Sequence, residues 1–174
     1  MRDNALGTKA SFGIRADNNP YQGITMNLSA ELLARLLTTA IRYSTLPAID
    51  PSELPPIEQV SATALADRVC PESPERCTTI AALFDAEGYR IYLRDSLNLD
   101  DPMDNSFIVH ELVHVLQYKK YGGDYFDDCQ RRIASERQAY FVQNNYLGEE
   151  GIDWREGFLV NFMKCPPEEA KAGS

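Results

Sequence analysis

The feature that most constrains the fold is the stretch Ser106–Lys120, which reads SFIVHELVHVLQYKK and contains both histidines of the chain. His110 and His114 lie four residues apart, so an α-helix places their imidazoles on one face, one turn apart. The remaining residues leave such a helix apolar on nearly every side, which is typical of a helix buried in a core. The stretch therefore predicts a buried helix that carries both histidines and Glu111.

Two neutral imidazoles at this spacing can bind one divalent ion, and zinc is the usual ion for nitrogen and carboxylate donors. A cation would also offset the cost of burying the Glu111 charge. Glu111 directly follows the first histidine, so it can reach a metal-activated water without being a ligand, which is the position of a general base. The alternative is a metal-free core helix whose histidines only hydrogen-bond their neighbours.

A third ligand is needed, because catalytic zinc commonly has three protein ligands and the chain has no third histidine. It has to be a carboxylate or, as a weaker option, a cysteine. Glu136 lies 22 positions after His114, on a second helix predicted over residues 128–146, and a rigid helix is a good platform for a ligand. Alternative ligands are the turn residues Asp124, Asp127 and Asp128.

The two motifs together resemble a known group of enzymes. His110-Glu111-Leu112-Val113-His114, followed by Glu136-Arg137-Gln138-Ala139, resembles the gluzincin type of zincin metallopeptidase, whose second helix supplies a glutamate in an E-x-x-A-like context. The resemblance covers about residues 78–147 and is closest to the minimal-size bacterial members.

This resemblance implies zinc-dependent hydrolysis of peptide bonds, as in an endopeptidase, on a peptide or protein substrate. It implies that His110, His114 and Glu136 hold one Zn²⁺ ion and that Glu111 is the general base. Such enzymes often stabilise the oxyanion with Tyr, His or Arg, so the candidates here are Tyr121, Tyr125 and Tyr140. Tyr140 lies one helical turn from Glu136 and is the nearest in principle. The alternative function is a catalytically silent zincin-fold module that binds a metal or a partner.

The rest of the chain predicts an α+β fold, mostly helical, with a short β-hairpin before the histidine helix. A helix capped by Ser29 is expected to run to about Tyr43, and the hairpin strands are expected over residues 78–84 and 89–93. The second of these is either an ordinary strand of the sheet, which we favour, or an exposed edge that could pair with an extended substrate. Asp104 or Asn105 is the expected cap of the histidine helix. Shorter elements are predicted over residues 57–61 (strand), 63–69 (helix) and 151–163 (a final helix or packed tail).

A chain of 174 residues usually makes one domain. We expect a flexible arm over residues 1–25, one metallopeptidase-like domain over 26–165 and a frayed tail over 166–174. The net charge of −9 disfavours nucleic acid and anionic membrane as partners, and no run is long and apolar enough to span a bilayer.

The four cysteines indicate the compartment. The pairing that we favour is Cys70–Cys77 with Cys129–Cys165, which implies an oxidising compartment such as the periplasm or the exterior, reached with a signal peptide that this sequence lacks. Four buried free thiols in a cytoplasmic protein are the alternative.

Overall fold

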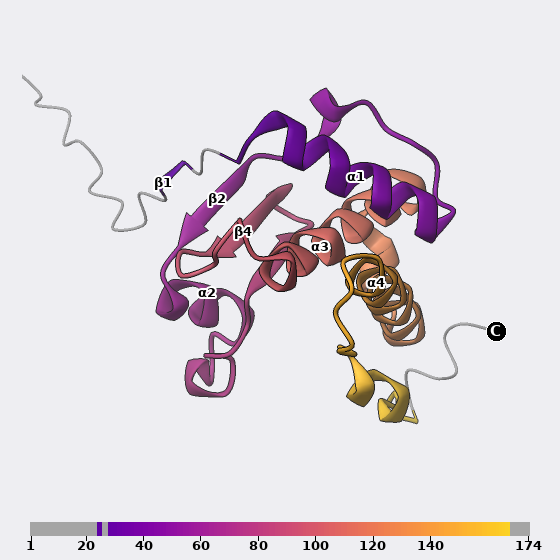
Figure 1. The fold of residues 1–174 in the computed structure, drawn as a ribbon. Helices are drawn as coiled ribbons and strands as arrows, with labels where there is room; N and C mark the ends of the chain where they lie inside the picture. The colour runs from indigo at the N-terminus through magenta and orange to yellow at the C-terminus, as the bar shows by residue number, and fades with distance from the viewer. Residues whose placement is uncertain (1–23, 26–27, 168–174) are drawn as a thin grey trace, which may run out of the picture.

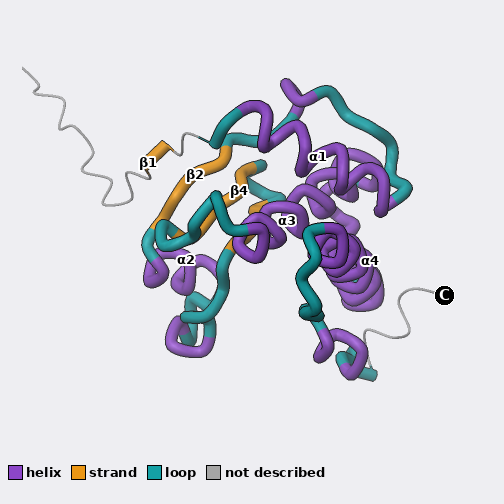
Figure 2. Tube along the Cα trace, in the orientation of Figure 1, coloured by secondary structure: helices purple, strands orange, loops and turns teal. Residues whose placement is uncertain are grey.

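The computed structural model describes residues 24–25 and 28–167 as a small α+β domain, mostly helical, with one sheet beside its helices (Figures 1 and 2). The helices are α1 (Ala30–Ser44), α2 (Ala62–Val69), α3 (Pro102–Tyr121) and α4 (Cys129–Glu149), with 3-10 turns η1 (Pro51–Glu53), η2 (Pro74–Arg76), η3 (Gly123–Phe126) and η4 (Phe158–Phe162). The strands are β1 (Ile24–Thr25), β2 (Ile57–Val60), β3 (Ala82–Asp85) and β4 (Arg90–Arg94). The predicted fold class is confirmed, including a hairpin that precedes the histidine helix α3.

The strand order of the sheet is β1-β2-β4-β3, with β2 and β4 parallel and the other two pairs antiparallel. Strand β4 is an ordinary interior strand, the favoured of the two possibilities, and not the exposed edge, because β2 pairs along the side of β4 that β3 leaves free. Backbone bonds from Ile91 N to Pro56 O (3.0 Å) and from Asp95 N to Val60 O (2.9 Å) close this pairing at both ends. Strand β3 is the edge of the sheet that lies against α3.

The two faces of the sheet bury different sets of side chains, as alternation along a strand requires. Ile91 and Leu93 of β4 face the main core, which they share with α1, α3 and α4. Tyr92, between them, faces a smaller cluster with Val60 and Leu65. The sheet therefore separates α2 from the other helices, and α3 lies in the middle of the larger core.

Helix α3 begins earlier than predicted. Asp101 is its N-cap and accepts a bond from Met103 N (2.9 Å), while Pro102 occupies the first helical position. Proline suits this position because its missing N–H has no partner there in any case. The predicted caps have other roles, since Asp104 accepts from Asn98 N (2.7 Å) and Asn105 donates to the carbonyl of Leu99.

The N-caps of the other two long helices are as their sequences indicate. Ser29 Oγ accepts from Leu32 N (3.1 Å) at the start of α1, which confirms that prediction. Asp128 caps α4 by accepting from Arg131 N (2.8 Å). Helix α4 continues through Gly148 to Glu149, slightly beyond the predicted end.

The predictions for the two ends of the chain can be compared with the structure only in part. Of the expected arm, residues 1–23 lie outside the described residues, and Ile24–Thr25 forms the short strand β1 against β2. Of the expected tail, residues 168–174 also lie outside. Within residues 151–163, expected to form a final helix or a packed tail, the structure has only the 3-10 turn η4, in which only Val160 is buried. The aromatic side chains expected to pack there are exposed instead.

Two disulfides, Cys70–Cys77 and Cys129–Cys165, join the cysteines in the predicted pairing, so none of the four is free. Such bonds are compatible with a secreted or periplasmic protein. Within the described ranges, no helix is long and apolar enough to cross a membrane.

Candidate metal centre

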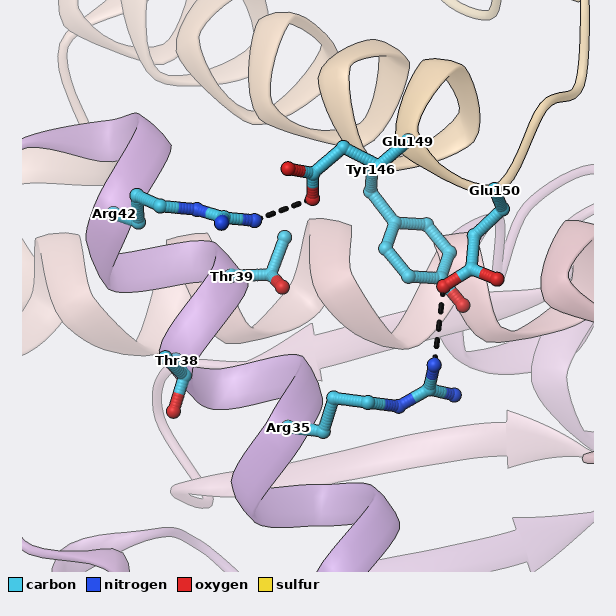
Figure 3. A pocket seen from close by; sticks show the side chains of 7 residues that line it. All are labelled: Arg35, Thr38, Thr39, Arg42, Tyr146, Glu149 and Glu150. Carbon is cyan, nitrogen blue, oxygen red and sulfur yellow. Dashed lines mark hydrogen bonds and ion pairs between the residues drawn. The ribbon is translucent and has the colours of Figure 1, made fainter.

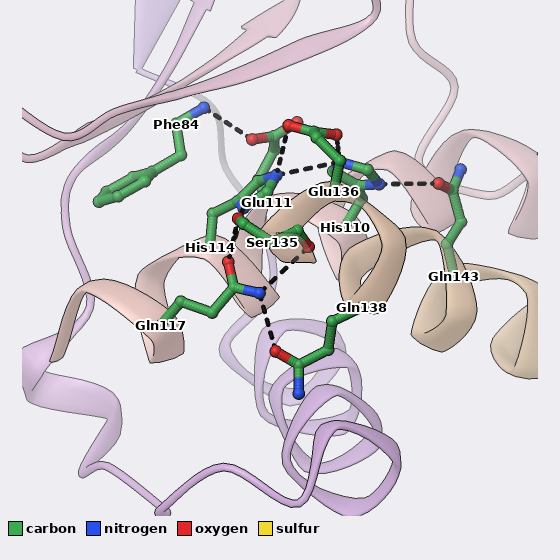
Figure 4. Close-up of polar contacts among 9 residues, drawn as sticks. All are labelled: Phe84, His110, Glu111, His114, Gln117, Ser135, Glu136, Gln138 and Gln143. Atoms are coloured by element: carbon green, nitrogen blue, oxygen red, sulfur yellow. Dashed lines mark hydrogen bonds and ion pairs between the residues drawn. The ribbon is translucent and has the colours of Figure 1, made fainter. Parts of the chain in front are cut away.

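Three side chains from α3 and α4 converge on one point (Figure 4). His110 Nε2 and His114 Nε2 lie 3.1 Å apart. The carboxylate of Glu136 lies 3.3 Å from the first nitrogen and 3.4 Å from the second. All three donor atoms fall within 4.8 Å of one another, so the group could hold a metal ion. Two imidazoles and a carboxylate are a donor set that zinc accepts.

The site lies at the surface of the helical core and is open on one side. The residues His110, Glu111 and His114 are each only 7% exposed, because α3 is enclosed on almost every side. The Glu136 side chain is 32% exposed. Among the three donors, Glu136 is therefore the one most exposed to solvent.

The other ring nitrogen of His110 is fixed by α4. His110 Nδ1–H donates to Gln143 Oε1 at 3.0 Å. The amide of Gln143 cannot be turned around without loss, because its Nε2 donates to Ser106 Oγ (2.9 Å), whose own proton goes to the Met103 carbonyl. In a neutral His110 that binds a metal, the proton would therefore be on Nδ1, which leaves the Nε2 lone pair free for the ion.

His114 is held in the same tautomer by a longer chain of amides. Its Nδ1 lies 2.9 Å from Gln117 Oε1 and 3.0 Å from Ser135 Oγ. Gln117 Nε2 donates to Gln138 Oε1 (2.8 Å), and Gln138 in turn donates to the Ser44 carbonyl of α1. Both histidines are thus oriented by uncharged amides, and α1 contributes to the position of His114.

Glu111 lies beside the three donors and is itself positioned by the sheet. Its Oε2 accepts a hydrogen bond of 2.7 Å from the backbone N–H of Phe84, on β3 (Figure 4). This contact leaves Oε1 available on the same carboxylate. An N–H that points from β3 to Glu111 also shows that the free edge of β3 faces the site.

Of the three tyrosines considered, only Tyr140 touches a donor residue. Its ring packs edge-on against His110, with centroids 4.5 Å apart. Burial, with the nearby charges of Glu136 and Glu111, raises the pKa of Tyr140 to about 12, so the hydroxyl stays protonated near neutral pH. Tyr121 and Tyr125 instead stack on each other at 4.5 Å, in the turn after α3.

Among the described residues, the aspartates of the turn do not join this group. Asp128 is used as the cap of α4, and Asp124 and Asp127 lie in or just after η3. Sequence reasoning missed Gln117 and Gln143, which orient the histidines. Their spacing held a signal, since Gln117 lies three residues after His114 and Gln143 lies two turns after Glu136.

In the metal-free protein, His114 and Glu136 shift each other's titration. Burial alone would lower the pKa of His114, but the hydrogen bond and the negative charge of Glu136 outweigh it and raise this pKa to about 9. Burial alone would raise the pKa of Glu136, and its bonds to His110 and His114 instead hold it well below its ordinary value. An imidazolium therefore compensates the carboxylate when no metal is present.

Zinc binding is accordingly expected to release a proton from His114. We expect the apparent association constant for Zn²⁺ to rise about tenfold per pH unit between pH 6.5 and 8, and to level off near pH 9. An ordinary histidine, with its pKa of 6.5, would give a plateau above about pH 7.5. The free energy of unfolding of the metal-free protein changes in the opposite direction. The ion pair between His114 and Glu136 stabilises this form fully below pH 6.5, and the stabilisation is lost as the pH rises through 9. Chelator competition across this pH range measures the first effect.

Replacing Gln143 by Leu is expected to weaken zinc binding about 10- to 100-fold, because His110 loses the acceptor that fixes its tautomer. Gln143→Glu keeps an acceptor at the same place and is expected to retain affinity. Competition with a chromophoric chelator compares the two variants at one pH. Equal loss in both variants would mean that Gln143 acts only through packing.

A cavity of about 340 Å³ lies elsewhere, between α1 and α4 (Figure 3). Two ion pairs cross it, Arg35–Glu150 at 3.1 Å and Arg42–Glu149. Each arginine is thus already neutralised by a glutamate, so the cavity offers no excess charge to attract a ligand.

Comparison with known proteins gives one family. Residues 27–169 match the sequence model of a family described as "Domain of unknown function (DUF6647)". The match spans both candidate helices and both disulfides. No curated protein and no solved structure matches the chain.

Proposed function

The chain belongs to the DUF6647 family, and we propose from the site itself that it is a zinc-dependent peptidase. The observation that carries the proposal is the convergence of His110, His114 and Glu136, with donor atoms within 4.8 Å of one another and the Glu111 carboxylate beside them. This combination of two imidazoles, one carboxylate ligand and a separate carboxylate base is what metal-assisted hydrolysis needs.

The roles of the residues follow from their positions. A zinc ion held by His110, His114 and Glu136 would supply a Lewis acid that lowers the pKa of water. Glu111 takes a proton from the attacking water as its oxygen bonds to the peptide carbonyl carbon. Glu111 then gives this proton to the leaving nitrogen as the C–N bond breaks, so one water is consumed for each bond. Tyr140, protonated and packed on His110, is the candidate donor to the oxyanion.

The substrate class is supported by strand β3. The N–H of Phe84 points from the free edge of β3 to Glu111, so an extended chain added to this edge would run past the general base. Peptides bind sheet edges in this way through backbone hydrogen bonds. A peptide or protein substrate therefore fits the site, and the two disulfides support export to the periplasm or the exterior.

A second candidate is a metal-binding module without activity. It is favoured by the bond between Phe84 N and Glu111 Oε2, which occupies one oxygen of the base. The two candidates agree on metal binding and differ on hydrolysis. Both differ from a metal-free core in which the histidines only pair with Glu136.

Metal content is the first test, measured by elemental analysis of protein purified without added metal or chelator. We expect close to one zinc per wild-type chain, and loss of the metal in His114→Ala and in Glu136→Ala. Digestion of a broad peptide library by the zinc-loaded wild type then tests hydrolysis. No metal and no uptake of added zinc would exclude the peptidase, whereas bound zinc without hydrolysis would favour the silent module.

A further inference from the structure

The segment after α4, residues 150–165, returns along α4 to its beginning, and we call it the strap (Figure 1). The Cys129–Cys165 disulfide ties its end to the first residue of α4. Asn144 binds it in the middle, because its side chain accepts from Glu156 N (2.8 Å) and donates to Glu156 O (3.1 Å). The strap is therefore fixed along α4 at two points.

The part of α4 that holds the strap also holds the metal ligand. Cys129, Tyr140 and Asn144 are separated by eleven and four residues, which places them on one stripe of the helix. Glu136, four residues before Tyr140, belongs to the same stripe. The strap is thus held by the stripe of α4 to which Glu136 belongs.

Gly157 makes the closest contact between the strap and the site. A Cβ on this residue would lie 2.1 Å from Tyr140 Cγ, and its φ of +74° also favours glycine. The bare backbone of the strap therefore packs on the Tyr140 ring, which itself packs on His110. One aromatic ring separates the strap from a proposed metal ligand.

Directly after Gly157, the strap exposes four large apolar side chains, which we call the apolar patch. They are 49–76% exposed and consist of Phe158, Leu159, Phe162 and Met163. The rings of Phe158 and Phe162 lie 5.2 Å apart, so the patch is continuous there. Of the side chains in η4, only Val160 is buried and holds the turn to the domain. The four exposed side chains add little to folding, and a clustered apolar surface of this kind marks a binding site.

We propose that the apolar patch is the specificity wall of the site, and that it binds a large apolar side chain of an extended peptide substrate close to the bond that is cleaved. This inference rests on the proposed peptidase function and adds the substrate class. The apolar patch is connected to the site by packing contacts, because Gly157 lies against the ring of Tyr140 and this ring lies against His110.

The size of the patch favours a substrate side chain over a second copy of the chain. Four partly exposed side chains offer on the order of 400 Å². A stable protein–protein interface needs about 800 Å² from each partner. One or two apolar residues of a peptide match the smaller area.

The test compares peptides that differ only in Phe or Ala at one position near the cleaved bond. For wild type we expect kcat/KM to be at least about tenfold higher for the Phe peptide at one such position. In F158S/L159S/F162S this preference is expected to fall below about twofold, chiefly through a lower kcat/KM for the Phe peptide, with the zinc content retained. Phe141→Ser is the matched control, because Phe141 is 58% exposed on α4 but lies about 140° around the helix from Glu136. It should keep the preference.

Binding of the same peptides, measured by fluorescence anisotropy on zinc-loaded Glu111→Gln protein, separates this inference from the proposed function. Cleavage by wild type with unchanged selectivity in the triple variant would overturn the role of the patch and leave the peptidase intact. Selective binding of the Phe peptide, lost in the triple variant but without cleavage by wild type, would support the patch and overturn the peptidase. A wild-type dimer that the triple variant converts to monomer by light scattering, with peptide selectivity unchanged, would show that the patch binds a second copy.

Discussion

Replacing Glu111 by glutamine is expected to lower kcat for peptide hydrolysis about 10³-fold while the bound zinc remains. Glutamine keeps the size of the side chain and can still accept from Phe84 N, so the local structure is preserved. It cannot take a proton from water, which removes the general base. The three donors in His110, His114 and Glu136 are unchanged, so metal content should match wild type.

Glu150→Gln is a suitable control, because it removes a carboxylate on the far end of α4 that pairs with Arg35 and not with the site. Peptide hydrolysis and elemental analysis are measured on the same preparations of both variants. Activity near the wild-type level in Glu111→Gln would assign the base to another group. Loss of zinc together with activity would make Glu111 a metal-site residue rather than a base.

Removing the Cys129–Cys165 disulfide, as Cys129→Ser with Cys165→Ser, is expected to cost about 4 kcal/mol in the free energy of unfolding. The bond closes a loop of 36 residues in sequence separation, and the entropy that a cross-link removes from the unfolded chain grows with loop length. The Cys70–Cys77 bond spans only seven, so its removal is expected to cost about 2.5 kcal/mol. The first bond also ties the end of the strap to the first residue of α4.

Urea unfolding of the two double variants at one pH measures this difference. The Cys70→Ser and Cys77→Ser pair is the matched control, because it removes a disulfide that does not bound α4 or the strap. Equal or reversed losses would contradict the loop-length explanation. Peptide selectivity is expected to decrease only in the variant without the Cys129–Cys165 bond, since only there is the apolar patch released.

The three donor residues of the candidate metal site could be predicted, because the spacing of residues along a helix determines which side chains lie on the same face. His110 and His114 needed only the four-residue interval, and Glu136 followed from the need for a carboxylate on a second helix. The orienting amides of Gln117 and Gln143 could not be assigned in the same way. A glutamine on a helix is usually solvated, and only the packing of α3 against α4 shows that these two face inward.

The order of the strands in the sheet also could not be predicted from the sequence around each strand. The alternation in residues 89–93 predicts a strand, but its place inside the sheet depends on the parallel pairing with β2, about 30 residues earlier in the chain. The aromatic residues of 158–162 look like core residues in sequence. They are exposed because a disulfide and Asn144 hold the strap in place of a hydrophobic face.

The position of α3 has a consequence for how such a protein can change. The helix that supplies both histidines and Glu111 is also the centre of the main core, so a substitution there alters stability and chemistry at once. The strap contributes Val160 to the interior but presents the four side chains of the apolar patch outward. Under the proposed function, new substrate preferences can arise by exchange of residues in the strap while α3 stays as it is, and a laboratory selection for altered specificity should begin with a library at positions 158, 159, 162 and 163.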